Sequence, residues 1–162
     1  MNNSTAETLA ELRGFFHAFE CVNGKTDHGY SFEISVAEPT GDIATDIAAK
    51  IVTDTLMSTS LQACDQWRKT LFQTLKRWLL AYLNDHHSIG RLTDASRTFS
   101  LSSRSFHKDM IDPIIDQIES IALVQSAYEI TVETEGFYAC DYTDLVLVTT
   151  GPLVFLHFDV CD

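Results

Sequence analysis

Cys140 is the residue of this sequence with the clearest potential for covalent chemistry. It lies in a predicted loop, Gly136–Tyr142, between two strands, where a thiolate nucleophile could be activated by a histidine such as His157. The acidic residues around it work against formation of a thiolate. A cysteine in a connection between strands is also more commonly a packing residue. A small hydrolase that uses Cys140 is therefore an alternative interpretation, and we expect His157 to pack at the surface of the sheet.

A second candidate is the triplet Asp85-His86-His87. Neighbouring imidazoles with a carboxylate can bind a divalent metal, and an Asp-His-His triplet resembles the signature of a phosphoesterase superfamily. That superfamily also needs Asp motifs at strand ends, whereas this triplet ends a predicted helix with few acids nearby. Histidine is favoured near a helix C-terminus by the helix dipole alone. We therefore expect no metal and no cofactor, and keep a hydrolase using His86 or His87 as an alternative.

The charged residues are strongly segregated along the chain. The net charge is −12, and residues 109–162 contain eleven carboxylates but no Lys or Arg, whereas residues 65–108 contain eight bases and three acids. The basic segment can pair with one acidic end of the chain but not with both, so an uncompensated acidic surface is expected. Such a surface repels nucleic acid and anionic lipid and attracts basic proteins.

The basic stretch 68–108 carries aromatic residues that could stack on nucleic-acid bases: Trp67, Trp78, Phe99 and Phe106. Its bases are spread over about forty residues, and Trp78 falls on the apolar side of a predicted helix. We therefore expect internal ion pairing and no nucleic-acid partner. The sequence also has no GxGxxG, GxxxxGK[ST], GxSxG or HExxH motif, which weakens the case for an enzyme without excluding one.

The first two thirds of the chain has mainly helical patterns. Ser4-x-x-Glu7 has the capping-box form and precedes an apolar stripe, and Thr59-x-x-Gln62 has the same form. Residues 88–108 show little periodicity and are predicted to be mostly loop. The expected elements are helix 5–20, strand 30–36, a helix from 40 to the Ser58-Thr59-Ser60 interruption, helix 60–86, a possible short strand at 97–101 and helix 109–123, with Pro113 in its first turn.

The last forty residues are predicted to form three strands, 126–135, 143–150 and 153–160. In the first, Tyr128, Ile130 and Val132 alternate with acidic residues, which places an acidic row on one face of the sheet. The sequence thus predicts an α+β fold, with helices packed on one face of a mostly antiparallel sheet of four to five strands. The expected order is α-β-α-α-(β)-α-β-β-β, in a single domain covering residues 1–162.

Composition indicates a cytoplasmic protein. No segment approaches about 18 apolar residues and no signal-peptide pattern is evident, so we expect no membrane association. The four cysteines show no CxxC pairing, and a domain of this length does not need disulfides.

These observations predict an acidic protein-binding module. Its most plausible function is that of a bacterial toxin-neutralising (immunity-type) inhibitor of a basic partner such as a nuclease, whose positive surface an acidic face would complement. A non-catalytic subunit of a larger assembly is a further alternative, and the sequence does not predict the oligomeric state. The expected partner-binding residues are five acids and two tyrosines of the last third: Glu129, Glu133, Glu135, Tyr138, Asp141, Tyr142 and Asp144.

Overall fold

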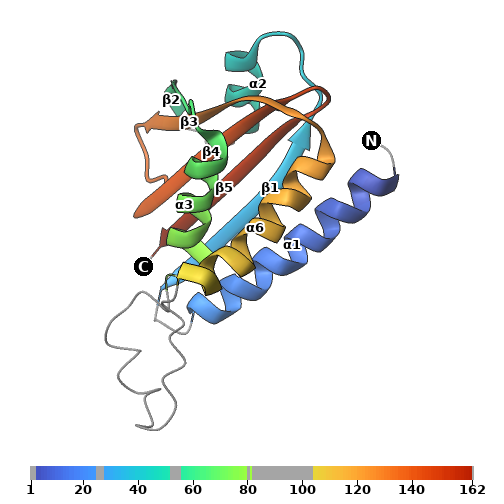
Figure 1. Ribbon diagram of the computed structural model, residues 1–162. Coiled ribbons are helices and arrows are strands. Elements are labelled where there is room, and N and C mark those ends of the chain that lie inside the picture. Colours follow the sequence, from blue (N-terminus) through green and yellow to red (C-terminus); the bar gives the residue numbers. More distant parts are fainter. Residues whose placement is uncertain (1–2, 25–27, 52–55, 80, 82–103, 162) are drawn as a thin grey trace, which may run out of the picture.

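The computed structural model describes residues 3–24, 28–51, 56–79, 81 and 104–161. It confirms the α+β class: helices pack against a five-stranded antiparallel sheet with the strand order β1-β5-β4-β3-β2 (Figure 1). The helices are α1 (Asn3–Asn23), α2 (Ile43–Lys50), α3 (Trp67–Leu79) and α6 (Arg104–Ile121). The strands are β1 (Gly29–Ala37), β2 (Leu56–Ala63), β3 (Val124–Thr134), β4 (Asp141–Thr149) and β5 (Leu153–Cys161).

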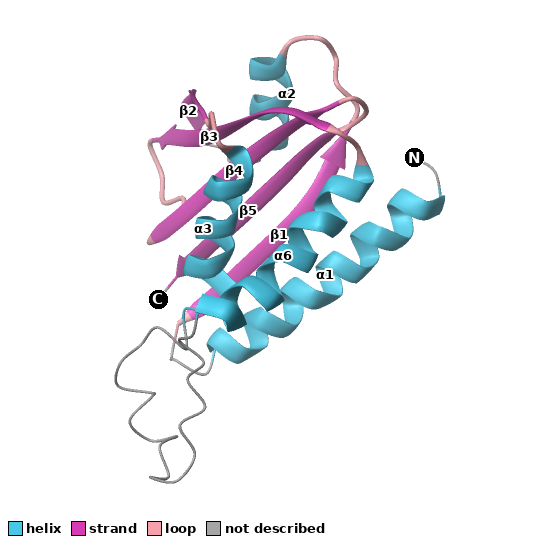
Figure 2. Ribbon diagram, viewed as in Figure 1, coloured by secondary structure: helices cyan, strands magenta, loops and turns pink. Residues whose placement is uncertain are grey.

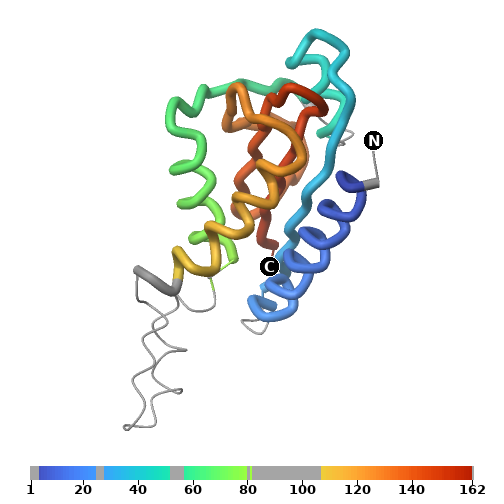
Figure 3. Tube along the Cα trace, turned by 45° about the vertical axis from the view of Figure 1, so that its right-hand side comes forward, coloured from blue at the N-terminus to red at the C-terminus, as the bar shows by residue number. Residues whose placement is uncertain are grey.

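Three helices, α1, α6 and α3, lie side by side on one face of the sheet (Figure 2). We call this the helix face. Their apolar stripes and the inward residues of the strands form the main core, in which Phe16 of α1, Trp78 of α3 and Phe158 of β5 are buried. Phe16 and Trp78 both contact the Phe158 ring, with centroids 5.6 and 6.3 Å away. In the turned view, α1 runs alongside β1 while α3 lies on the opposite side of the molecule (Figure 3).

The opposite face of the sheet, which we call the α2 face, has a smaller apolar cluster. Ile47 of α2 is fully buried against residues of β3, β4 and β5, including Ile130, Val146 and Phe155. Asp42 caps the N-terminus of α2 by accepting a hydrogen bond from the amide of Ala44. This face is therefore covered by α2 at one end and carries polar residues at the other.

Residues 56–63 form strand β2, which corrects the expectation that they end one helix and begin the next. Thr59 does not cap a helix but pairs with Val132 of β3. Ser and Thr have a weak preference for helix interiors, because their side chains can hydrogen-bond to the nearby main chain. Pairing of this segment with β3 therefore outweighs the capping-box pattern. Helix α3 consequently begins at Trp67 and not at residue 60. The possible strand at 97–101 lies outside the described residues.

Helix α6 also begins earlier than expected, at Arg104, so Pro113 lies inside the helix and not in its first turn. Pro113 is exposed, while Ile111, Ile114 and Ile115 beside it are buried. The free energy gained by burying these isoleucines therefore outweighs the loss of the main-chain hydrogen bond that proline removes from the helix. Within the part of the chain that the structure describes, no helix is long and apolar enough to cross a membrane.

Candidate functional site

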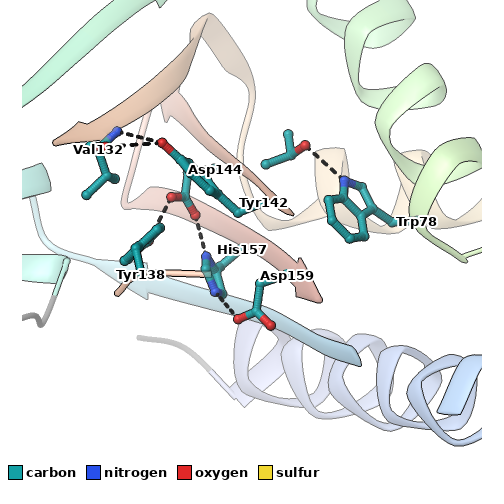
Figure 4. Close-up of polar contacts among 8 residues, drawn as sticks. Trp78, Val132, Tyr138, Tyr142, Asp144, His157 and Asp159 are labelled. Atoms are coloured by element: carbon teal, nitrogen blue, oxygen red, sulfur yellow. Dashed lines mark hydrogen bonds and ion pairs between the residues drawn. The ribbon is translucent and has the colours of Figure 1, made fainter. Parts of the chain in front are cut away.

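His157 is the centre of a polar cluster on the α2 face of the sheet (Figure 4). The antiparallel register places Asp144 of β4 directly opposite His157 of β5, and the period of two places Asp159 on the same face. The His157 Nδ1 atom is 2.5 Å from an Asp144 carboxylate oxygen, and its Nε2 atom is 2.7 Å from one of Asp159. Both ring nitrogens are thus held by carboxylates.

This arrangement determines the charge of His157. Burial alone would lower the pKa of the imidazole, but the hydrogen bonds and negative charges of Asp144 and Asp159 outweigh burial and raise the pKa to about 10. At neutral pH the ring is therefore an imidazolium that donates both of its N–H groups. In this state His157 has no free nitrogen with which to accept a proton, so it does not fit the part of a general base for Cys140.

Tyr138 and Tyr142 complete the cluster. The Tyr138 hydroxyl donates a 2.8 Å hydrogen bond to Asp144, and its ring makes edge contacts with Tyr142 and His157 at centroid distances of 4.8 and 5.8 Å. Burial, together with the charge of Asp144, raises the pKa of Tyr138 above its usual range. The phenol therefore stays protonated and acts as a hydrogen-bond donor.

Tyr142 closes a gap in the sheet. The regular pairing of β3 with β4 ends at Ile130 and Asp144. Beyond it, the Tyr142 hydroxyl accepts a 3.0 Å hydrogen bond from the Val132 amide and lies 3.3 Å from the Val132 carbonyl oxygen. The side chain thereby replaces the main-chain partner that Val132 lacks on its β4 side. Three of the expected partner-binding residues, Tyr138, Tyr142 and Asp144, thus make contacts that hold the sheet together.

A pocket of about 370 Å³ opens beside this cluster. Its polar lining combines Glu33, Lys50 and His157 with Tyr138 and Asp144, and Ile51, Ile130 and Phe155 are among its apolar walls. Charges of both signs therefore lie in one cavity, and Asp144 already has two hydrogen-bond partners. The pocket has no unsatisfied buried side-chain atom among the described residues that would indicate a missing ligand.

The other expected acids lie apart from this cluster. Glu129 and Glu133 project from β3 toward the helix face, and Glu135 follows in the loop after β3. All three are exposed, and none makes an ion pair within the described residues. The Glu133 carboxylate accepts a 2.7 Å hydrogen bond from the Ser58 hydroxyl of the neighbouring strand β2. This group is the free acidic part of the predicted site, and we call Glu129, Glu133 and Glu135 the acidic row.

Asp141 differs from the acidic row because it is already paired. Its carboxylate contacts the guanidinium of Arg77 on α3. Arg68, also on α3, contacts Asp116 and Glu119 of α6, and these hydrogen bonds raise the pKa of the guanidinium. Two bases of the segment 65–108 therefore pair internally, as expected from the sequence.

The seven expected residues thus fall into three groups: the acidic row, Asp141 with Arg77, and the network around Asp144. Sequence reasoning missed Asp159, which holds the second nitrogen of His157. The pattern His157-Phe158-Asp159 carried the signal, because residues two apart in a strand share a face. Ser58 was missed because it was placed at a helix break instead of beside β3.

The hydrolase alternatives depend on Cys140 and on His86 or His87. Cys140 is an exposed free cysteine, and His86 and His87 lie outside the described residues. Among the described residues, no group of three or more His, Cys, Asp or Glu is placed to hold a metal ion. Comparisons of the chain with protein-family models, curated proteins and solved structures found no match.

Proposed function

We propose that this protein is a non-catalytic module that binds a basic protein partner through the acidic row, Glu129, Glu133 and Glu135. The observation that carries the proposal is that these exposed carboxylates make no ion pair with any described base, although α3, with its four Lys and Arg, packs on the same face of the sheet. Carboxylates left free in this way produce a local negative field that favours a positively charged surface.

The distribution of charge supports a protein partner of opposite sign. Residues 109–162 contain no Lys or Arg, and the chain carries a net charge of −12. A nuclease presents a basic surface to its nucleic acid, and an acidic protein that covers that surface blocks access to it. A toxin-neutralising, immunity-type function in the cytoplasm is the form of this proposal that fits a small, acidic single domain.

Tyr138, Tyr142, Asp144 and Asp141 are not part of the proposed contact surface. Tyr138, Tyr142 and Asp144 stabilise the sheet, and Asp141 holds Arg77. Substitution of Tyr138, Tyr142 or Asp144 would disturb the sheet as well as any interface, and substitution of Asp141 would release Arg77. The acidic row therefore offers the cleaner test.

The test is charge reversal after recovery of the partner from the native host by affinity pull-down. The double variant Glu129→Lys/Glu133→Lys should bind the partner at least about tenfold more weakly, mainly through a lower association rate. The matched control is Glu7→Lys/Glu38→Lys, which makes the same change in net charge at exposed residues elsewhere. It should lose much less affinity. Equal binding by the two double variants would contradict the proposed surface.

A further inference from the structure

The two edges of the sheet differ in how their main-chain groups are satisfied. At the β1 edge, side chains of α1 bond to two of the outward groups: the Phe32 amide donates a 2.6 Å hydrogen bond to Glu20, and Arg13 donates a 3.1 Å hydrogen bond to the Ile34 carbonyl. This helix therefore blocks strand addition at β1 (Figure 1).

The β2 edge has no such cover within the described residues. The Cys64 amide donates a 2.9 Å hydrogen bond to the Ala127 carbonyl, which fixes the alternation of the β2–β3 ladder. In an antiparallel pair, every second residue of a strand forms hydrogen bonds with its neighbour. The main-chain N–H and C=O groups of the even-numbered residues of β2 therefore point toward β3. The N–H and C=O groups that point away from the sheet then belong to Thr59, Leu61 and Ala63. The β2–β3 register shifts between Leu56 and Ser58, so this alternation does not extend to Met57.

The composition of β2 leaves this edge open. Leu56–Ala63 contains no charged residue and no proline, the residue types that usually protect an edge strand. Met57 is 62% exposed, and Ser58, Ser60 and Gln62 are exposed as well. Among the described residues, this edge thus has no paired main-chain group at Thr59, Leu61 or Ala63, and the side chains beside these groups are uncharged.

The acidic row lies one strand behind this edge. On the helix face, Glu133 is opposite Ser58 and Glu129 is opposite Gln62, and the Glu133 carboxylate is drawn toward β2 by the Ser58 hydroxyl. A strand added at the edge would lie about 10 Å from β3, two strand spacings away. A Lys or Arg side chain and a Glu side chain together span that distance, and the short Ser58 side chain does not block it.

We propose that the free edge of β2 binds an extended segment of the basic partner by antiparallel strand addition. This proposal rests on the proposed function and specifies its contact. The segment's Lys or Arg side chains lie on the helix face, where they reach Glu129 and Glu133, while its alternate residues bond to the outward groups of β2. Main-chain hydrogen bonds supply affinity, and the acidic row selects a basic sequence.

A second copy of this chain is a poorer occupant of the same edge. Antiparallel pairing of β2 with β2 of another copy would bring Glu129 and Glu133 of both copies onto one face of the joined sheet. These carboxylates would lie about 14 Å apart, three strand spacings, and they would add to the repulsion between two copies that each carry a net charge of −12. The charge around the edge therefore favours a basic partner over self-association.

The probe is an acetylated, amidated eight-residue peptide of alternating Lys and Thr, titrated into the protein and followed by NMR. We expect its binding to shift the amide signals of the three outward residues of β2, Thr59, Leu61 and Ala63. In an antiparallel pair, the peptide residues that bond to β2 have side chains on the α2 face, so these are the Thr residues. N-methylation of every Thr should therefore weaken binding at least about tenfold, while N-methylation of every Lys should change it less than about threefold.

Two protein variants test the same contact by changing β2 instead of the peptide. Thr59→Pro removes an outward N–H while leaving the β3 ladder intact, and Thr59→Ala keeps that N–H. We expect the peptide to bind Thr59→Ala normally and Thr59→Pro at least about fivefold more weakly, with both variants folded by circular dichroism. Sedimentation should show a monomer; a dimer that Thr59→Pro dissociates would overturn the assignment of the edge to a basic partner.

The results separate the two proposals. If both N-methylated peptides bind like the unmodified one, or if no β2 amide shifts, strand addition is refuted. The proposed function still stands in that case, provided that Glu129→Lys/Glu133→Lys weakens binding of the recovered partner. If that double variant binds the recovered partner as the control does, the proposed function fails and strand addition by a basic partner fails with it.

Discussion

Replacement of His157 by Gln should destabilise the protein in a pH-dependent way. The pKa of His157 is raised from 6.5 to about 10 by Asp144 and Asp159, which corresponds to about 5 kcal/mol of preferential interaction with the imidazolium. Because the side chain is 26% exposed, solvent screening reduces the expected loss to about 3 kcal/mol at pH 7. Asp144, which is almost fully buried, would lose its positively charged partner.

The sign of the pH dependence follows from proton linkage. The folded protein holds a proton on His157 between pH 6.5 and about 10, whereas the unfolded chain does not. This contribution to stability is fully present below pH 6.5 and is lost as the pH rises through about 10. The difference in unfolding free energy between wild type and His157→Gln should therefore shrink by at most about 1.4 kcal/mol per pH unit, and by about 3 kcal/mol in total, as the pH rises from 6.5 to about 10.

The assay is urea unfolding of both proteins, followed by tryptophan fluorescence at pH 6.5, 8 and 9.5. His17→Gln is the matched control because His17 is 75% exposed on α1, and it should change stability by less than about 0.5 kcal/mol. Parallel stability curves for wild type and His157→Gln across this range would refute the assignment of His157 as a buried imidazolium.

Three further substitutions test separate parts of the structure. Tyr142→Phe should cost about 1–2 kcal/mol of unfolding free energy, because it leaves the Val132 main chain without its hydroxyl partner; urea unfolding measures this. Ile47→Ala should cost about 2–4 kcal/mol in the same assay, since Ile47 is fully buried between α2 and the sheet. Lys69→Gln should tighten binding of the partner by about two- to fivefold in a titration, because Lys69 and Glu129 line the same cavity and the lysine weakens the negative field there.

The strands with a clear period of two could be predicted from the sequence, because one face of each is buried. The alternation at Tyr30, Phe32 and Ile34 predicts the strand that the structure shows as β1. The alternation at Tyr128, Ile130 and Val132 predicts β3 in the same way. The failure at β2 has a physical cause. Its short run of Ser and Thr has weak alternation, and the strand is held by pairing with β3, a contact distant in sequence.

The candidate site was predictable only in part. The local period placed Glu129 and Glu133 on one face, but it did not place Asp144 on the other face, because that depends on the register between β3 and β4. The pairing of Asp141 with Arg77 joins β4 to α3, which requires the packing of a helix on the sheet. Charge composition therefore located the acidic segment of the chain, and tertiary contacts determined which of its acids are free of ion pairs among the described residues.

The most direct test of the central claim is NMR mapping of the surface that the recovered partner covers. The amide signals of the isotope-labelled protein should change along β2 and β3, at residues 57–63 and 129–135, and the outward amides of β2 should become protected from hydrogen exchange. Signals of α1 should change little. A footprint centred on α1 and α6, with β2 and β3 unaffected, would contradict the account.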